Sequence, residues 1–124
     1  MKKLFAVIAA VSALASGAAV AQNVSIVDQY GLGNGQVTAQ SGANFSYTGQ
    51  SGRFNGSMTG QSGAGNAAAT IQTGRRNGSI TTQSGYFNGS MTVQTGRRQN
   101  ASTNQVGVGN QSLTIQTDGV SPHP

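Results

Sequence analysis

Polar and apolar residues alternate along most of this chain in blocks of about seven residues, each followed by a loop of about four that contains glycine. The block NGSMTGQ at 55–61 and its near copy NGSMTVQ at 88–94 show the pattern. Strict alternation with Thr, Ile and Val is typical of strands, and glycines supply the bends between them. A helix is disfavoured because Gly, Ser, Asn and Thr are poor helix formers. The pattern therefore predicts an all-β chain.

The blocks repeat every eleven residues. Gln recurs in steps of eleven, with one step of ten where the loop 41–43 has lost a residue, and Asn, or once Gln99, stands six residues earlier. Nine blocks with the consensus N-x-S-x-T-x-Q-S/T-G-x-x occupy residues 23–117. Three sets of positions recur and are predicted to carry the fold: stacking amides at Asn34, Asn55, Asn66, Asn77, Asn88 and Asn110; stacking amides at Gln29, Gln40, Gln50, Gln61, Gln72, Gln83, Gln94, Gln105 and Gln116; and turns at Gly31, Gly42, Gly52, Gly63, Gly74, Gly85, Gly96 and Gly107.

Nine short strands can form either a hairpin meander or a solenoid. The Asn-Gly pairs, as at 34–35 and 77–78, are a hairpin signal and keep the antiparallel meander open. A solenoid with two strands per turn instead stacks each block on the block after next, so that identical residues meet every 22 residues in parallel register. Because only the second arrangement explains the repetition, we predict a β-solenoid of about four to five turns, in the range 22–117.

The two faces of each strand compete for the interior. Apolar residues such as Ile26, Met58 and Leu113 favour the even positions of each block as the core. The odd positions are monotonous, reading Asn, Ser, Thr and Gln, and stacked amides can satisfy one another's hydrogen bonds. We predict the Asn/Ser/Thr/Gln face inside, which would leave Ile71, Val93 and Ile115 outside, beside Met91 and Leu113, as a surface for lateral association.

The first 21 residues differ from the repeats. Lys2 and Lys3 precede an apolar run that ends at Ala19-Val20-Ala21, which predicts a secretory signal peptide over 1–21. The alternative, a membrane-spanning helix, needs about 20 apolar residues, and this run is shorter and interrupted by Ser and Gly. A short tail over 118–124 follows the repeats, and its prolines can end the last strand without covering it. The chain is therefore expected to leave the cytosol.

Composition excludes several classes of function. The chain has no Cys, a single histidine in the tail, and two acidic residues far apart, so we expect no enzyme, no metal site, no cofactor and no small-molecule substrate. The low content of large apolar residues would by itself suggest a disordered polar chain, but the regular eleven-residue repeat argues against disorder.

The basic residues of the repeats follow the odd-numbered blocks. Five arginines against two aspartates leave the part after residue 21 with a side-chain charge of +3. A solenoid would gather these arginines along one basic edge: Arg53, Arg75, Arg76, Arg97 and Arg98. Two interpretations stay open: charge that discourages aggregation of adjacent strands, or weak binding of extracellular DNA or anionic glycans.

The pattern Q-x-G-x-x-N-x-S-x-T-x-Q resembles the curlin repeat over about residues 23–117. The resemblance implies a β-solenoid subunit of bacterial extracellular amyloid, with cross-β structure in the polymer and roles in the biofilm matrix and surface adhesion. The chain departs from the family pattern in two ways. Ser and Thr replace the usual Ala and larger aliphatic residue, and the repeats begin at Asn23 without the Gly/Asn-rich segment of the major subunit.

The expected function is therefore head-to-tail self-assembly into a secreted cell-surface fibre, since the uncapped ends of a solenoid present unpaired backbone groups. The resemblance implies a second curli-like subunit and an outer-membrane export channel as partners. Two alternatives remain: a capped monomer that binds ice through Ser/Thr ladders, and a minor nucleating subunit.

Overall fold

The computed structural model describes residues 22–118, and every regular element in this range is a strand. The strands are β1 (Val24–Leu32), β2 (Gly35–Arg53), β3 (Gly56–Arg75), β4 (Gly78–Tyr86), β5 (Gly89–Arg97), β6 (Asn100–Val108) and β7 (Gln111–Thr117). The predicted leader 1–21 and residues 119–124 of the tail lie outside the described residues.

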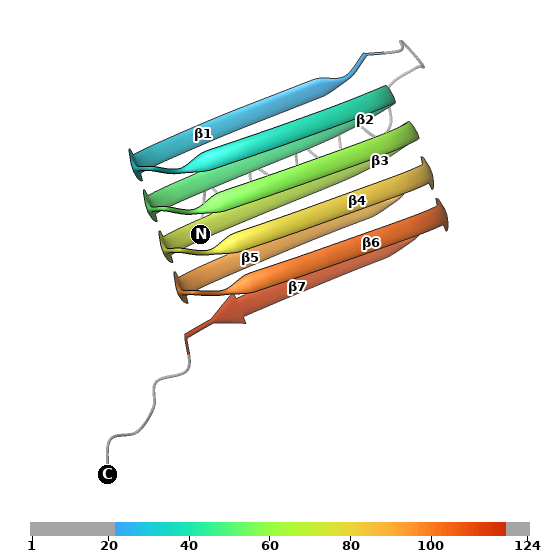
Figure 1. Ribbon diagram of the computed structural model, residues 1–124. Coiled ribbons are helices and arrows are strands. Elements are labelled where there is room, and N and C mark those ends of the chain that lie inside the picture. The colour runs from blue at the N-terminus through green and yellow to red at the C-terminus, as the bar shows by residue number, and fades with distance from the viewer. Residues whose placement is uncertain (1–21, 119–124) are drawn as a thin grey trace, which may run out of the picture.

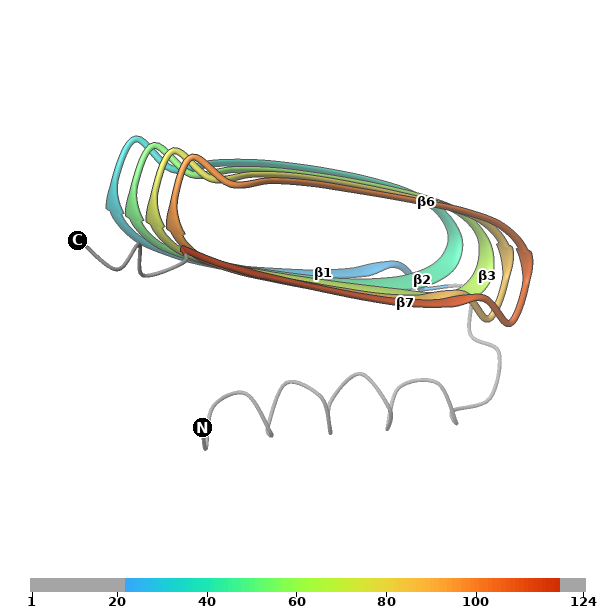
Figure 2. The same ribbon diagram turned by 90° about the horizontal axis from the view of Figure 1, so that it is seen from below.

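The strands coil into a flattened solenoid of about four turns (Figure 1). One long side, sheet 1, contains β1, residues 45–53 of β2, residues 67–75 of β3, β5 and β7. The other long side, sheet 2, contains residues 35–43 of β2, residues 56–64 of β3, β4 and β6. Figure 2 shows the two sheets as the long sides of an oval whose narrow ends are the loops.

All strand pairs are parallel and in register, which confirms the predicted solenoid and excludes the meander. Gln50 pairs with Gln72, and Gln72 pairs with Gln94, so identical residues lie over one another every 22 residues. The register shifts once, between Ala43 and Phe45, where the sequence has lost one loop residue.

Seven elements replace the nine predicted strands because pairing continues through two of the bends. β2 and β3 each pass from sheet 2 to sheet 1 without losing their pairing at Gly42 and Gly63. All eight predicted turn glycines have φ between 98° and 130°, a region that glycine enters without strain. At Gly74 a β-carbon would lie 1.9 Å from the carbonyl oxygen of Gly96 on the next turn, so both the turn and the stacking require glycine.

The Asn/Ser/Thr/Gln face is the interior, as predicted. Thr48, Gln72 and Gln94 are completely buried, whereas buried apolar residues are few. Ala68 and Ala101 take the place of Ser at the third position of their blocks. The core between the sheets is therefore polar, and its stability depends on satisfying the buried amides with hydrogen bonds.

Candidate functional site: polar ladders and open ends

The repeat glutamines form two hydrogen-bonded ladders along the solenoid axis. In sheet 1 each Nε2 donates to Oε1 of the glutamine on the next turn, through Gln29, Gln50, Gln72, Gln94 and Gln116, at 2.6–2.8 Å. In sheet 2 the same pattern joins Gln40, Gln61, Gln83 and Gln105 at 2.7–2.8 Å. Both ladders run in one direction, with donors facing the C-terminal end of the stack.

Every ladder glutamine except Gln29 also ties the two sheets together. The Nε2 of Gln72 donates a second bond, 2.9 Å long, to the carbonyl of Gly56 in sheet 2, and Gln94 bonds the carbonyl of Gly78 in the same way at 2.9 Å. A glutamine is long enough to cross the core, so this cross-sheet bond explains why the position is not the shorter asparagine. The sequence predicted the stacking but not this second bond.

The repeat asparagines close the turns. The Nδ2 of Asn77 donates to the carbonyls of Thr73, four residues earlier, and of Gly96 on the next turn, at 3.2 and 3.3 Å. Its Oδ1 accepts the backbone N–H of Gln99, the equivalent residue of the next turn. The sequence suggested side-chain hydrogen bonds between all stacked asparagines, but among the described residues they join only Asn44, Asn66 and Asn88, at 3.0 Å.

Most core hydroxyls have no hydrogen-bond partner within the described part of the protein. In the part of the chain that the structure describes, the buried side-chain oxygens of Thr48, Thr70, Thr81 and Thr92, and of Ser46, Ser57, Ser79 and Ser90, have none. Unsatisfied buried hydroxyls reduce stability by about 1–3 kcal/mol each. The amide ladders, and not the hydroxyls, therefore hold the sheets together.

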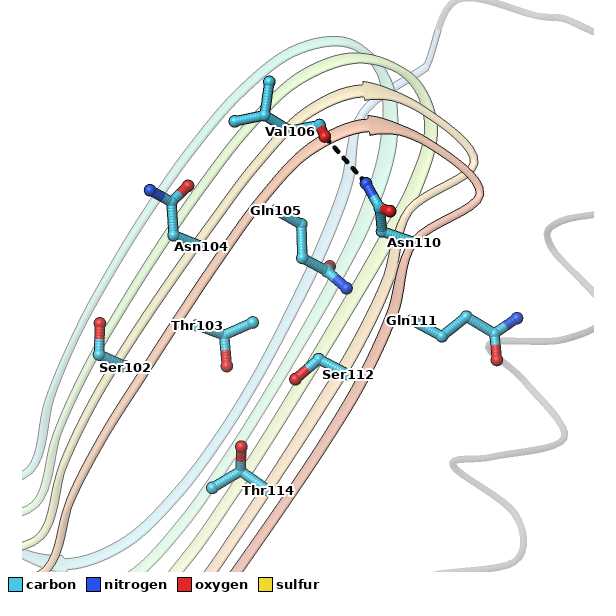
Figure 3. Close-up of a pocket in the computed structure, with 9 residues that line it drawn as sticks. All are labelled: Ser102, Thr103, Asn104, Gln105, Val106, Asn110, Gln111, Ser112 and Thr114. Carbon is cyan, nitrogen blue, oxygen red and sulfur yellow. Dashed lines mark hydrogen bonds between the residues drawn. The ribbon is translucent and has the colours of Figure 1, made fainter.

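Among residues 22–118, no strand covers the interior at the C-terminal end of the stack. A pocket lies between β6 and β7, and Thr103, Gln105, Ser112 and Thr114 point into it (Figure 3). Asn110 closes its own turn by donating to the carbonyl of Val106 at 3.0 Å, the bond dashed in Figure 3. The Oε1 of Gln99 is buried and has no hydrogen-bond partner.

The N-terminal end presents the complementary groups. Gln29 and Gln40 donate forward along their ladders, and no described residue donates to their Oε1 atoms. The other edge of β1 pairs with no described strand. The unused glutamine acceptors of the N-terminal end and the unused glutamine donors of the C-terminal end can therefore satisfy one another.

The five arginines are all exposed and lie on one narrow side, as the loop order predicts. Arg53 pairs with Arg75, and Arg75 with Arg97, in adjacent strands of sheet 1. Adjacent strands are about 4.8 Å apart, so these charges repel one another unless an anion or solvent screens them. Arg76 and Arg98 follow in the left-handed region at φ 58° and 57°.

The sequence pattern did not lead us to expect these left-handed positions. Phe54 and Phe87 share the conformation, at φ 59° and 57°. The signal was present, because equivalent loop positions hold Gly33, Gly65 and Gly109, and all three have positive φ.

The outer faces carry apolar residues, but less uniformly than expected. Leu113 and Ile115 of sheet 1 are exposed, whereas Ile71, Met91 and Val93 are half-buried. On sheet 2, Val37, Met58 and Ile80 line a shallow groove beside the glycines that open their strands.

No protein-family model matches this sequence, and a search of curated proteins finds no match. Within residues 22–118, His, Cys, Asp and Glu form no cluster of three or more that could hold a metal ion. Among the same residues, no helix is long and apolar enough to cross a membrane.

Proposed function

We propose that this chain is a secreted structural subunit that self-assembles head-to-tail into extracellular curli-like amyloid fibres, which serve the biofilm matrix and surface adhesion. The observation that carries the proposal is the pair of open, complementary ends on a parallel, in-register stack. Each end exposes backbone groups of an edge strand, a template for pairing with another chain.

Addition of a second copy extends the contacts that already hold the monomer together. Gln105 and Gln116 each retain an amide hydrogen for an incoming glutamine, because each uses Nε2 for a single bond across the core, 3.0 and 2.8 Å long. The incoming Gln29 and Gln40 supply Oε1 acceptors. Assembly is therefore templated: the last turn sets the register of the next molecule.

Export through an outer-membrane channel and cooperation with a second curli-like subunit belong to this proposal. Weak binding of extracellular DNA or anionic glycans would use the exposed arginine edge. The role of minor nucleator is a variant of the same function, and cross-seeding of a major curlin subunit distinguishes the two roles. The Ser and Thr side chains that an ice-binding surface would need are mostly buried, so the structure offers no observation in favour of that alternative.

The first test uses the chain from Gln22 to Pro124, followed by thioflavin T fluorescence, electron microscopy and fibre diffraction. Fibres with a reflection at about 4.8 Å along the fibre axis are expected. A chain that stays monomeric across a range of ionic strengths would refute the proposal.

Two matched variants on β6 sharpen the test. Gln105→Lys places a charge at the end of a buried ladder, and Asn104→Lys places the same charge on the exposed outer face of the same strand. We expect Gln105→Lys to slow elongation at least about tenfold, because the charge would be buried in the contact, and Asn104→Lys, on the solvent-exposed face, to elongate at least as fast as the parent. Circular dichroism of both monomers checks that they fold, and equal elongation rates would contradict the templating mechanism.

A further inference from the structure

The two sheets contain unequal numbers of strands. Sheet 1 has five strand positions, from β1 to β7, and sheet 2 has four, ending at β6. The difference arises because the described repeats make nine blocks, an odd number. Any second copy stacked on the C-terminal end meets this mismatch.

Stacking without rotation leaves a gap. Suppose that β1 of the incoming copy pairs with β7. The first half of its β2 then enters sheet 2 one strand spacing beyond β6. One strand position in sheet 2 stays vacant, and the edge of β6 has no partner. If the incoming copy is instead turned by half a turn about the fibre axis, its β1 pairs with β6 and the first half of its β2 pairs with β7. Both sheets then continue without a vacant position.

The residues at the two ends match better in the rotated arrangement. The repeat register places Tyr30 and Leu32 of the incoming copy over Val106 and Val108, four exposed apolar residues in loops of the form x-Gly-x-Gly. Gly31 and Gly107 both have positive φ, at 113° and 124°. Without rotation, the same loop would lie over Thr117 and Asp118.

Asp28, on the outer face of β1, gives a second comparison. With rotation its carboxylate lies beside the amide of Asn104, and without rotation it lies beside the exposed, apolar Ile115. Placing a carboxylate against an apolar side chain removes water without supplying a partner.

The unpartnered polar groups agree with the same arrangement. Along sheet 2, the Oδ1 atoms of Asn34 and Asn55 accept the backbone N–H of the equivalent residue one turn further on. Gln99 is the last member of this column, and its Oε1 is buried without a partner. Only the rotated copy brings a backbone N–H, that of Asn23, to this position.

We propose that successive subunits of the fibre are related by a half-turn screw, so that β1 of each copy pairs with β6 of the copy before it. This inference rests on the proposed function. It places the arginine edge on alternate sides of the fibre, so no continuous basic stripe forms. The rise per subunit is four and a half strand spacings, about 21–22 Å, whereas unrotated stacking needs five, about 24 Å.

Disulfide trapping in this cysteine-free chain tests the pairing. Leu32→Cys with Val108→Cys joins neighbouring copies only in the rotated arrangement, because within one chain the two positions lie on opposite narrow sides. The control, Tyr30→Cys with Thr117→Cys, joins copies only without rotation, because within one chain the two positions lie at opposite ends of sheet 1. Strands paired in register fall within disulfide reach.

We expect oxidised fibres of the Leu32/Val108 variant to give a ladder of covalent oligomers, and those of the Tyr30/Thr117 variant to remain monomers under denaturing electrophoresis. Electron cryomicroscopy of the unmodified fibre should show the half-turn and the shorter rise. Fibres with the reverse cross-linking would overturn the half-turn alone. Absence of fibres from the unmodified chain would overturn the proposed function as well.

Deleting residues 78–88 isolates the effect of strand number. The deletion joins Asn77 to Gly89 and preserves the Asn-Gly step of the repeat, leaving eight blocks. Fibres of this variant are expected to lose the half-turn and to rise by about 19 Å per subunit. Retention of the half-turn would show that the number of blocks does not set the symmetry.

Discussion

The buried glutamine ladder predicts that replacing one of its glutamines by leucine strongly lowers the free energy of unfolding, although leucine is more hydrophobic and similar in volume. Gln72 is completely buried, and leucine has a similar volume, so Gln72→Leu leaves no large cavity. The substitution removes three hydrogen bonds: one donated by Gln50 at 2.7 Å, one to Gln94 at 2.8 Å and one to the carbonyl of Gly56 at 2.9 Å.

The size of the effect follows from the groups left without partners. Each buried polar group that loses its only partner destabilises the fold by about 1–3 kcal/mol. Gln50 keeps a bond to the carbonyl of Gly35 at 3.1 Å, so its loss is partial. Burial of the leucine side chain offsets part of the cost. We therefore expect the free energy of unfolding to fall by about 3–5 kcal/mol.

The assay is urea unfolding of freshly prepared monomer, followed by far-ultraviolet circular dichroism at several protein concentrations. The control is Gln111→Leu, the same chemical change at an exposed glutamine, which should alter the free energy of unfolding by less than about 0.5 kcal/mol. If Gln72→Leu cost no more than this control, the ladder would not be what holds the sheets together.

Three further predictions concern the glycine bends, the core hydroxyls and the ionisation of Tyr47. Gly74→Ala should lower the free energy of unfolding by about 3 kcal/mol or more, whereas Gly60→Ala, where a β-carbon meets nothing within 4 Å, should be nearly neutral; equal effects would contradict the stacking constraint. Thr81→Val removes a hydroxyl that has no partner and should raise the melting temperature, with a gain of about 1 kcal/mol; a loss above about 1 kcal/mol would show that the hydroxyl is satisfied. Partial burial, then the charge of Asp28, raises the pKa of Tyr47 above its ordinary value of 10.0, so the stability that protonated Tyr47 contributes below pH 10.0 should decline as the pH rises through its folded-state pKa. Asp28→Asn should lower that pKa in an absorbance titration, and an unchanged pKa would show that the charge of Asp28 does not act on Tyr47.

The basic edge shows how much a repeated sequence can reveal by its spacing. The loops after odd blocks contain all five arginines, and a two-strand turn necessarily gathers them on one side. The left-handed backbone conformation of Arg76 and Arg98 became visible only in the structure, because the sequence of one arginine-containing loop does not indicate it.

The eleven-residue spacing was enough to predict the solenoid. Identical residues at fixed intervals contact one another only when the repeats stack in register. The missing residue in the loop 41–43 appears in the structure as the single register shift. Glycine at every turn was likewise predictable, because side chains cannot adopt φ near 120° without strain.

The monotony of the odd positions predicted the interior face, but the bonds that the amides make across the core came from the coiled chain alone. By hydrophobicity, Ile80 and Leu113 should be buried, yet their side chains are 50% and 65% exposed. Thr81 and Gln83 are only 1% exposed. This follows because the space between the sheets matches a glutamine reaching the opposite backbone, so the hydrogen bonds of one turn depend on the next turn and on the facing sheet. Those distances exist only after the chain has coiled, and no local pattern of residues contains them.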